Sequence, residues 1–112
     1  MQIYHNPRCQ KSRLSLALLQ ENGVEPTIRL YLEEVPTEKE LKAVLKKLKM
    51  KAADLVRKSE KIFKEQFKGR ELSEQEWVEA MIEYPKLIER PIVLSGSRAV
   101  IGRPPEDVLQ LL

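Results

Sequence analysis

The chain has 112 residues, 42% of them hydrophobic, which is enough for one domain with a core of its own. Its 20 basic and 17 acidic side chains give a net charge of +3, and acids are interleaved with the lysines. With only 5% aromatic residues to stack on bases, this composition does not favour a nucleic-acid-binding protein.

The soft metal ligands are few, because the chain has one cysteine and one histidine. An internal disulfide and a cysteine-clustered zinc site are therefore excluded, and we expect no metal. No charged-then-apolar leader and no apolar run of membrane-spanning length is present. We expect a cytoplasmic protein that does not enter a membrane.

The first third of the chain predicts a strand, a helix and a second strand. Residues 2–4 are predicted as a short strand and residues 10–22 as a helix, in which Leu14, Ala17 and Leu18 share a face. Residues 27–32, "TIRLYL", have the β-branched and aromatic side chains of a strand. This βαβ opening places the segment 5–9 between the first strand and the helix.

The middle of the chain predicts one helix after another. Two capping boxes mark helix starts, Thr37 with Glu40 and Ser73 with Glu76, and Pro85 ends the last helix. The predicted helices cover residues 36–50, 51–59, 59–68 and 73–84.

The tail returns to strands and then closes on a helix. Strands are predicted at 91–94 and 98–101 around a turn at Gly96, close enough to form an antiparallel hairpin, and Pro104 and Pro105 open a last helix. The whole order predicts a mixed four-stranded sheet with flanking helices, in an α/β or α+β fold interrupted by a helical insertion.

The segment "YHNPRCQKSR" contains the only cysteine, Cys9, among basic or potentially basic neighbours. His5, Arg8, Lys11 and Arg13 surround it, and it stands at the predicted start of a helix, where backbone N–H groups point outward. Both features favour the thiolate, so we expect a lowered pKa and a reactive sulfur. A small apolar filler in the first turn is the structural alternative.

The neighbours of Cys9 narrow the kind of thiol chemistry. A phosphatase-type loop needs an arginine six positions after the cysteine, where this chain has Ser15. A dithiol redox pair needs a second cysteine at the position of Ser12. The site therefore has one nucleophilic sulfur and must take its second thiol from another molecule.

Four ordered segments of the chain resemble one known family. "HNPRCQKSR", "EPTIRLYL" with "PTEKEL", "LVRKS" and "ERPIVLSGSRAVIGRPPEDVL" are similar to the corresponding segments of the glutaredoxin-dependent arsenate reductases. The resemblance implies a thioredoxin-like fold over residues 1–112 as a single domain. Its core would comprise residues 1–35 and 86–112, and residues 36–85 would form the helical insertion.

The resemblance also implies the chemistry. Cys9 would attack arsenate or a related oxyanion, glutathione would thiolate the adduct, and a glutaredoxin would complete the reduction. Arg57, Arg90 and Arg103 are similar to the basic triad that holds the oxyanion. Three guanidiniums, which stay charged and present forked donors, would offset the repulsion between an anionic substrate and a thiolate.

Four further residues support this predicted site. Pro91 is similar to the cis proline that faces the cysteine in thioredoxin-like folds, so we expect a cis Arg90–Pro91 bond. His5 could orient the thiolate or only hydrogen-bond the turn. Ser12 could donate to the sulfur, and Arg13 could add positive charge, or both could lie on an exposed first turn.

Two alternative functions remain open from the sequence. A regulator similar to the Spx-type proteins, which contact RNA polymerase, would have the same fold, although those proteins typically carry Cys-x-x-Cys. A glutathione-dependent thiol transferase would keep both the fold and Cys9. Substrate assays separate the transferase from the reductase.

Overall fold

The computed structural model describes residues 1–112, which form two compact units. The first unit comprises Met1–Glu34 and Arg90–Leu112, and the second comprises Val35–Glu89. That all 112 residues fold as a single domain stays a prediction. No helix in the chain combines the length and the apolar character needed to cross a membrane.

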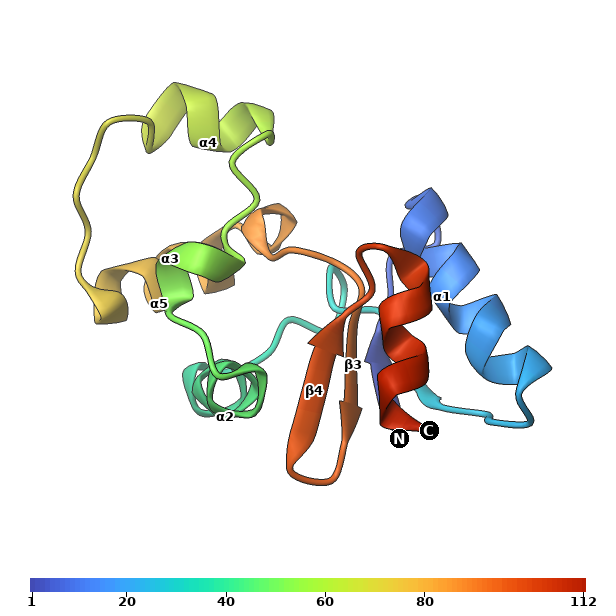
Figure 1. Ribbon diagram of the computed structural model, residues 1–112. Helices are drawn as coiled ribbons and strands as arrows, with labels where there is room; N and C mark the ends of the chain where they lie inside the picture. The colour runs from blue at the N-terminus through green and yellow to red at the C-terminus, as the bar shows by residue number, and fades with distance from the viewer. The chain divides into compact units, whose positions relative to one another are not determined.

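A mixed four-stranded sheet forms the first unit, as the sequence predicts. Its strands are β1 (Gln2–Tyr4), β2 (Thr27–Arg29), β3 (Ile92–Ser95) and β4 (Arg98–Ile101), in the order β2-β1-β3-β4. β1 pairs in parallel with β2 and antiparallel with β3, and β3 and β4 form the predicted hairpin (Figure 1). Parallel pairing of β1 and β2 confirms the βαβ opening.

Two helices lie side by side against the sheet of this unit, α1 (Gln10–Glu21) and the 3-10 helix η2 (Pro105–Leu111) (Figure 1). Both contribute to one apolar cluster with the sheet, formed by Ile3, Leu19, Val93, Val108 and Leu111. Burial of these side chains supplies the main driving force for packing the two helices on the sheet.

The buried face of α1 differs from the predicted one. Leu14 is 47% exposed, whereas Ser12, Ser15 and Leu19 are buried. A small side chain is needed at position 15, because a Cβ added to Gly102 would collide with Ser15. Close approach of the Gly102 backbone to the Ser15 side chain therefore favours a small residue at position 15.

The second strand is shorter than predicted, since it ends at Arg29, opposite the last residue of β1. The chain then turns, and the Leu30 carbonyl accepts hydrogen bonds from the backbone N–H groups of Glu33 and Glu34. Tyr31 is fully buried in this turn and stacks on Tyr4, with ring centroids 6.3 Å apart. The aromatic side chain that favours a strand here packs from a turn instead.

The second unit is helical, with α2 (Glu38–Leu48), α3 (Ala52–Leu55), α4 (Lys61–Gln66), α5 (Glu74–Glu83) and the 3-10 turn η1 (Pro85–Leu87). Both predicted capping boxes are present, at Thr37 with Glu40 and at Ser73 with Glu76. The helices that contain no such box, α3 and α4, are shorter than predicted.

Helix α3 stops early because the chain leaves it to pair with a distant segment. Val56 forms an isolated antiparallel bridge with Ile88, and both side chains are buried. The next backbone N–H, that of Arg57, donates to the Leu87 carbonyl at 2.6 Å. These bonds satisfy backbone groups that a longer helix would have paired internally.

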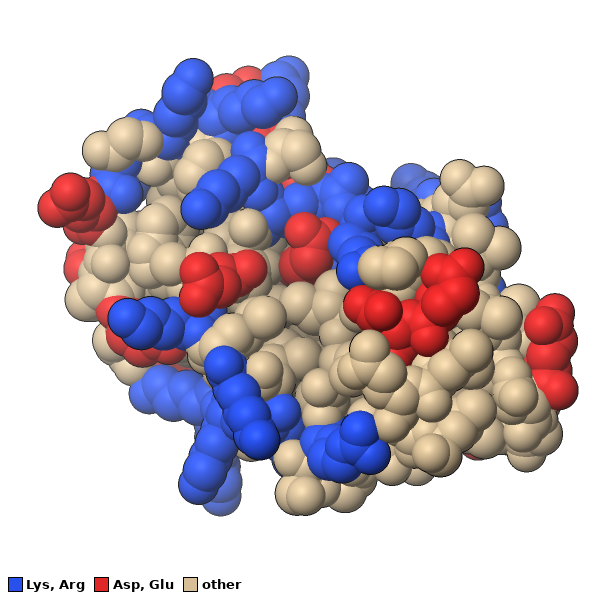
Figure 2. Space-filling model, viewed as in Figure 1, with Lys and Arg blue, Asp and Glu red and all other residues tan.

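Charged side chains of both signs are exposed on the molecular surface. Figure 2 shows Lys and Arg interspersed with Asp and Glu over the visible face. This mixing agrees with the interleaving of acidic side chains and lysines in the sequence.

Candidate active site

Cys9 occupies the junction between the loop after β1 and helix α1, where it is the N-cap residue. Its backbone N–H donates to the Asn6 carbonyl at 3.0 Å, and its carbonyl accepts from the Arg13 N–H at 3.0 Å. The first turn of α1 contains no acidic side chain that would offset the positive end of the helix. The sulfur, half-buried, therefore lies where an anion is favoured.

The loop before Cys9 is held by a buried hydrogen-bond network. The Ser12 hydroxyl lies 2.6 Å from His5 Nδ1 and accepts from the backbone N–H of Asn6 at 3.0 Å. Arg13 Nη1 donates to the Pro7 carbonyl at 2.8 Å. The structure thus brings the predicted supporting residues His5, Ser12 and Arg13 to the loop, where their side chains brace the backbone.

The Arg90–Pro91 bond is cis, as predicted, and it directly precedes β3. The Pro91 carbonyl accepts from the Gly102 N–H at 3.0 Å. A Cβ at position 102 would also crowd the Pro91 ring, so this approach requires glycine. This role of Gly102 was not predicted from the sequence, although a glycine between a strand and an Arg–Pro pair is a usable signal.

A second cis bond, Arg103–Pro104, also escaped prediction. It follows β4, so the two Arg–Pro pairs flank the β-hairpin. The repeated dipeptide in the sequence was the available signal.

Arg103 lies directly beside the cysteine. Its Nη2 donates toward Cys9 Sγ at 3.7 Å, and its Nε donates to the Arg90 carbonyl at 2.8 Å. The second bond fixes the guanidinium plane, so the charge is held at the sulfur by the segment that contains the cis proline. Two residues 94 positions apart in sequence form this pair.

The pKa of Cys9 is lowered, as predicted. Burial raises the pKa, but the Ser12 backbone N–H, a hydrogen bond from Arg90, and the charges of Arg90 and Arg103 together outweigh it. These causes differ from the basic neighbours on which the sequence-based argument relied. The arginines that stabilise the thiolate come from the far end of the chain.

His5 does not supply a positive charge to the sulfur. Burial and the nearby Arg13 cation lower its pKa, which favours the neutral imidazole at neutral pH. Its ring is hydrogen-bonded to Ser12. Of the two roles considered from the sequence, bonding the turn is the one with a contact in the structure.

Arg57 belongs to the second unit and makes ion pairs there. Its Nη1 lies 3.1 Å from a Glu89 carboxylate oxygen, and its Nε lies 3.3 Å from Glu60. Neither carboxylate partner of Arg57 was predicted from the sequence.

The chemical capacity of the site follows from a single sulfur beside two guanidiniums. A thiolate is a nucleophile, and Arg90 and Arg103 can pair with the oxygens of an anion that approaches it. No three His, Cys, Asp or Glu side chains lie together in an arrangement that could hold a metal ion.

The strand order, the cysteine at the start of the helix after β1 and the cis proline before β3 define a thioredoxin-like α/β protein. The chain belongs to the ArsC family, whose model matches residues 4–111. The structure matches that of an arsenate reductase from Vibrio cholerae with a TM-score of 0.95 and 45% identity, over 99% of this chain and 96% of that one.

Two sequence relatives extend this likeness. The chain is 44% identical to an arsenate reductase of Haemophilus influenzae, over 98% of this chain and 97% of that protein. It is 49% identical to the Escherichia coli protein YfgD, described as uncharacterized, over 100% of this chain and 96% of that protein. The family therefore includes both proteins named for arsenate reduction and one with no stated activity.

Proposed function

We propose that the chain is an arsenate reductase in which the Cys9 thiolate attacks an arsenic oxyanion, with glutathione and a glutaredoxin as reductants. The observation that carries the proposal is the contact of 3.7 Å between Arg103 Nη2 and Cys9 Sγ. It places a cation where the nucleophile forms and where an anionic substrate must approach. Homology to arsenate reductases supports arsenate as the substrate.

In the first step the Cys9 sulfur forms a bond to arsenic, and one arsenate oxygen leaves as water after protonation. The lowered pKa of Cys9 provides the thiolate that this step needs. Arg90 and Arg103 would pair with the remaining oxygens and reduce their repulsion of the thiolate. Following the family resemblance, we assign Arg57 to the same oxyanion.

The reduction itself requires two electrons, and Cys9 has no partner cysteine in the chain. Glutathione would add its sulfur to the arsenic of the Cys9 adduct and displace a second oxygen as water. A glutaredoxin thiol would then attack the glutathione sulfur. Arsenic gains two electrons, the two external thiols end as a disulfide, and water releases arsenite and regenerates Cys9.

Turnover of arsenate by the purified protein, with glutathione and a glutaredoxin present together, tests the proposal. We expect arsenite formation that disappears in Cys9→Ser and when either thiol is omitted. A protein that leaves arsenate unchanged while Cys9 still alkylates rapidly would overturn the substrate assignment. Reduction of a glutathione mixed disulfide by that protein would support a thiol transferase, and binding to RNA polymerase would support an Spx-type regulator.

A further inference from the structure

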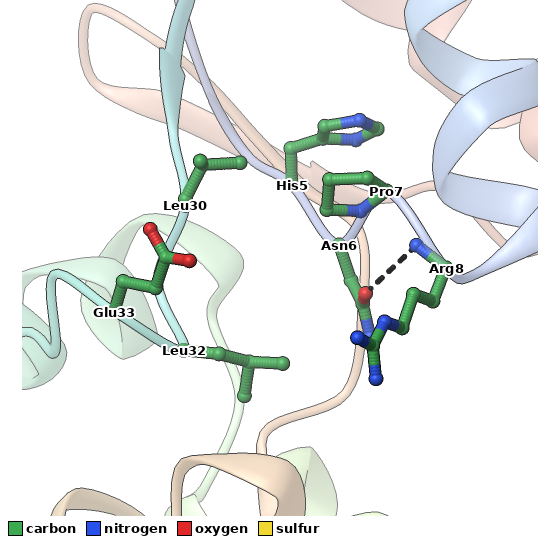
Figure 3. Close-up of a pocket in the computed structure, with 7 residues that line it drawn as sticks. All are labelled: His5, Asn6, Pro7, Arg8, Leu30, Leu32 and Glu33. Carbon is green, nitrogen blue, oxygen red and sulfur yellow. Dashed lines mark hydrogen bonds between the residues drawn. The ribbon is translucent and has the colours of Figure 1, made fainter.

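A pocket of about 220 Å³ lies within the first unit, beside the loop of residues 5–8 that precedes Cys9, here called the cysteine loop. Residues 5–8 form one wall, and Leu30, Leu32 and Glu33 form the other (Figure 3). These segments follow the carboxyl ends of the parallel strands β1 and β2, where open α/β sheets bind their ligands. The proposed oxyanion site, between Cys9 and Arg103, does not use this space.

The two walls of the pocket carry opposite charges. Arg8 extends from the cysteine loop, and Glu33 lies in the turn after β2, across the pocket from it (Figure 3). Both side chains are exposed and belong to no ion pair of the structure. A ligand that carries both a carboxylate and an ammonium group would satisfy the two charges at once.

Asn6 adds an oriented amide donor to the wall that contains Arg8. The residue is 8% exposed, and its Oδ1 accepts the Arg8 backbone N–H at 3.0 Å, which sets the orientation of the amide. The Nδ2 group has no protein partner, although it lines the pocket. An oriented amide donor that is open to the pocket can donate to an acceptor on a ligand there.

We propose that this pocket binds the γ-glutamyl end of glutathione, an inference that rests on the proposed function. The α-carboxylate of that residue would accept from Asn6 Nδ2 and pair with Arg8, and its ammonium group would pair with Glu33. Leu30 and Leu32 supply apolar surface for the glutamyl methylene groups. Asn6 and Arg8 on one wall would therefore bind the carboxylate, and Glu33 on the other wall would bind the ammonium group of the same ligand.

The pocket is adjacent to the nucleophile, because one of its lining residues directly precedes Cys9 in the chain. Arg8 is the residue before Cys9, and consecutive Cα atoms are ~3.8 Å apart. In glutathione the cysteinyl residue is likewise the one joined to the γ-glutamyl residue. Binding of the glutamyl end would hold the thiol near Cys9, where it adds to the arsenic adduct described above.

Titration with S-methylglutathione, which binds without reacting, tests the site directly. Amide shifts in a nuclear magnetic resonance spectrum are expected at residues 6–8 and 30–33. Glu33→Gln should weaken binding about tenfold, the loss of one charge-assisted hydrogen bond, whereas Glu34→Gln should bind as the wild type does. Asn6→Asp keeps the acceptor for the Arg8 N–H but removes the donor, so it should also weaken binding.

Fragments of the ligand identify which end is bound. S-methyl-γ-glutamylcysteine should compete with S-methylglutathione, and S-methylcysteinylglycine should not. Shifts confined to another surface, or equal affinities of Glu33→Gln and Glu34→Gln, would overturn the proposal.

Kinetics distinguish this proposal from the one on which it rests. If arsenate is reduced, Glu33→Gln should raise the KM for glutathione and leave the KM for arsenate unchanged. An unchanged KM for glutathione would overturn the pocket assignment while the reductase assignment stands. Pocket binding of S-methylglutathione without any arsenate turnover would overturn the reductase assignment alone.

Discussion

Replacing Arg103 tests whether a cation from the far end of the chain makes Cys9 reactive. In Arg103→Gln the side chain keeps much of its length but loses the charge that lies 3.7 Å from Cys9 Sγ. Two unit charges 4 Å apart interact by about 1 kcal/mol in bulk water and by about 4 kcal/mol near a protein surface. Because the sulfur is half-buried, we take the lower figure as the minimum loss.

A loss of about 1 kcal/mol corresponds to a roughly fivefold smaller ratio of thiolate to thiol at a fixed pH below the titration midpoint. The rate of alkylation by iodoacetamide, measured against pH, reports this ratio. We expect the midpoint of Arg103→Gln to move upward from that of the wild type. Arg103→Lys retains a charge but not the guanidinium fork, so its midpoint should fall between the two.

Lys11→Gln is the matched control, because it removes an exposed cation that is close to Cys9 in sequence. Its midpoint should stay at the wild-type value, since the causes of the lowered pKa lie in Ser12, Arg90 and Arg103. Equal midpoints for Arg103→Gln and the wild type, with a shift in Lys11→Gln, would show that the sequence neighbours control the thiolate. That result would refute the role assigned to Arg103.

Three stability measurements test other parts of the structure. Gly102→Ala should lower the free energy of unfolding by about 1–3 kcal/mol, because the new methyl group would crowd Ser15 and Pro91. Urea denaturation measures this loss. A change below about 0.5 kcal/mol, which is roughly the range of a surface substitution, would contradict the crowding. Thr37→Ala should cost about 1 kcal/mol by removing the capping box of α2, measured in the same way, and an unchanged midpoint would remove that role. Because the pKa of His5 is lowered in the folded chain, the unfolded chain binds the imidazole proton more tightly, and the free energy of unfolding should fall as the pH drops through about 6.5. His5→Gln should flatten this part of the plot of unfolding free energy against pH. An unaltered plot would contradict the lowered pKa of His5.

Local sequence signals were sufficient for the elements whose causes lie within a few residues. The capping boxes at Thr37 and Ser73 each join a side chain to a backbone group three positions away, so their residue types reveal the helix starts. The β3–β4 hairpin is likewise marked by the turn at Gly96 between two short strands. The helix start at Cys9 was predicted for the same reason, and with it the lowered pKa.

The packing of these elements depends on approaches between distant segments, which local signals do not specify. Leu14 was predicted on the shared apolar face of α1 but is 47% exposed, whereas Ser15, whose burial the local pattern does not indicate, is buried against Gly102. Val56 leaves its predicted helix for a similar reason, since its partner Ile88 lies 32 positions further along.

The candidate site likewise combines a feature with a local cause and a feature that depends on distant segments. The sequence by itself determined that one sulfur stands at a helix start with no second cysteine in the chain, from which we predicted that a second thiol would come from another molecule. Only the tertiary structure decided which cations reach that sulfur, because sheet pairing brings Arg90 and Arg103 to Cys9 while Arg13 braces the Pro7 carbonyl. Coulomb energy falls with distance in space, and separation along the chain does not measure that distance.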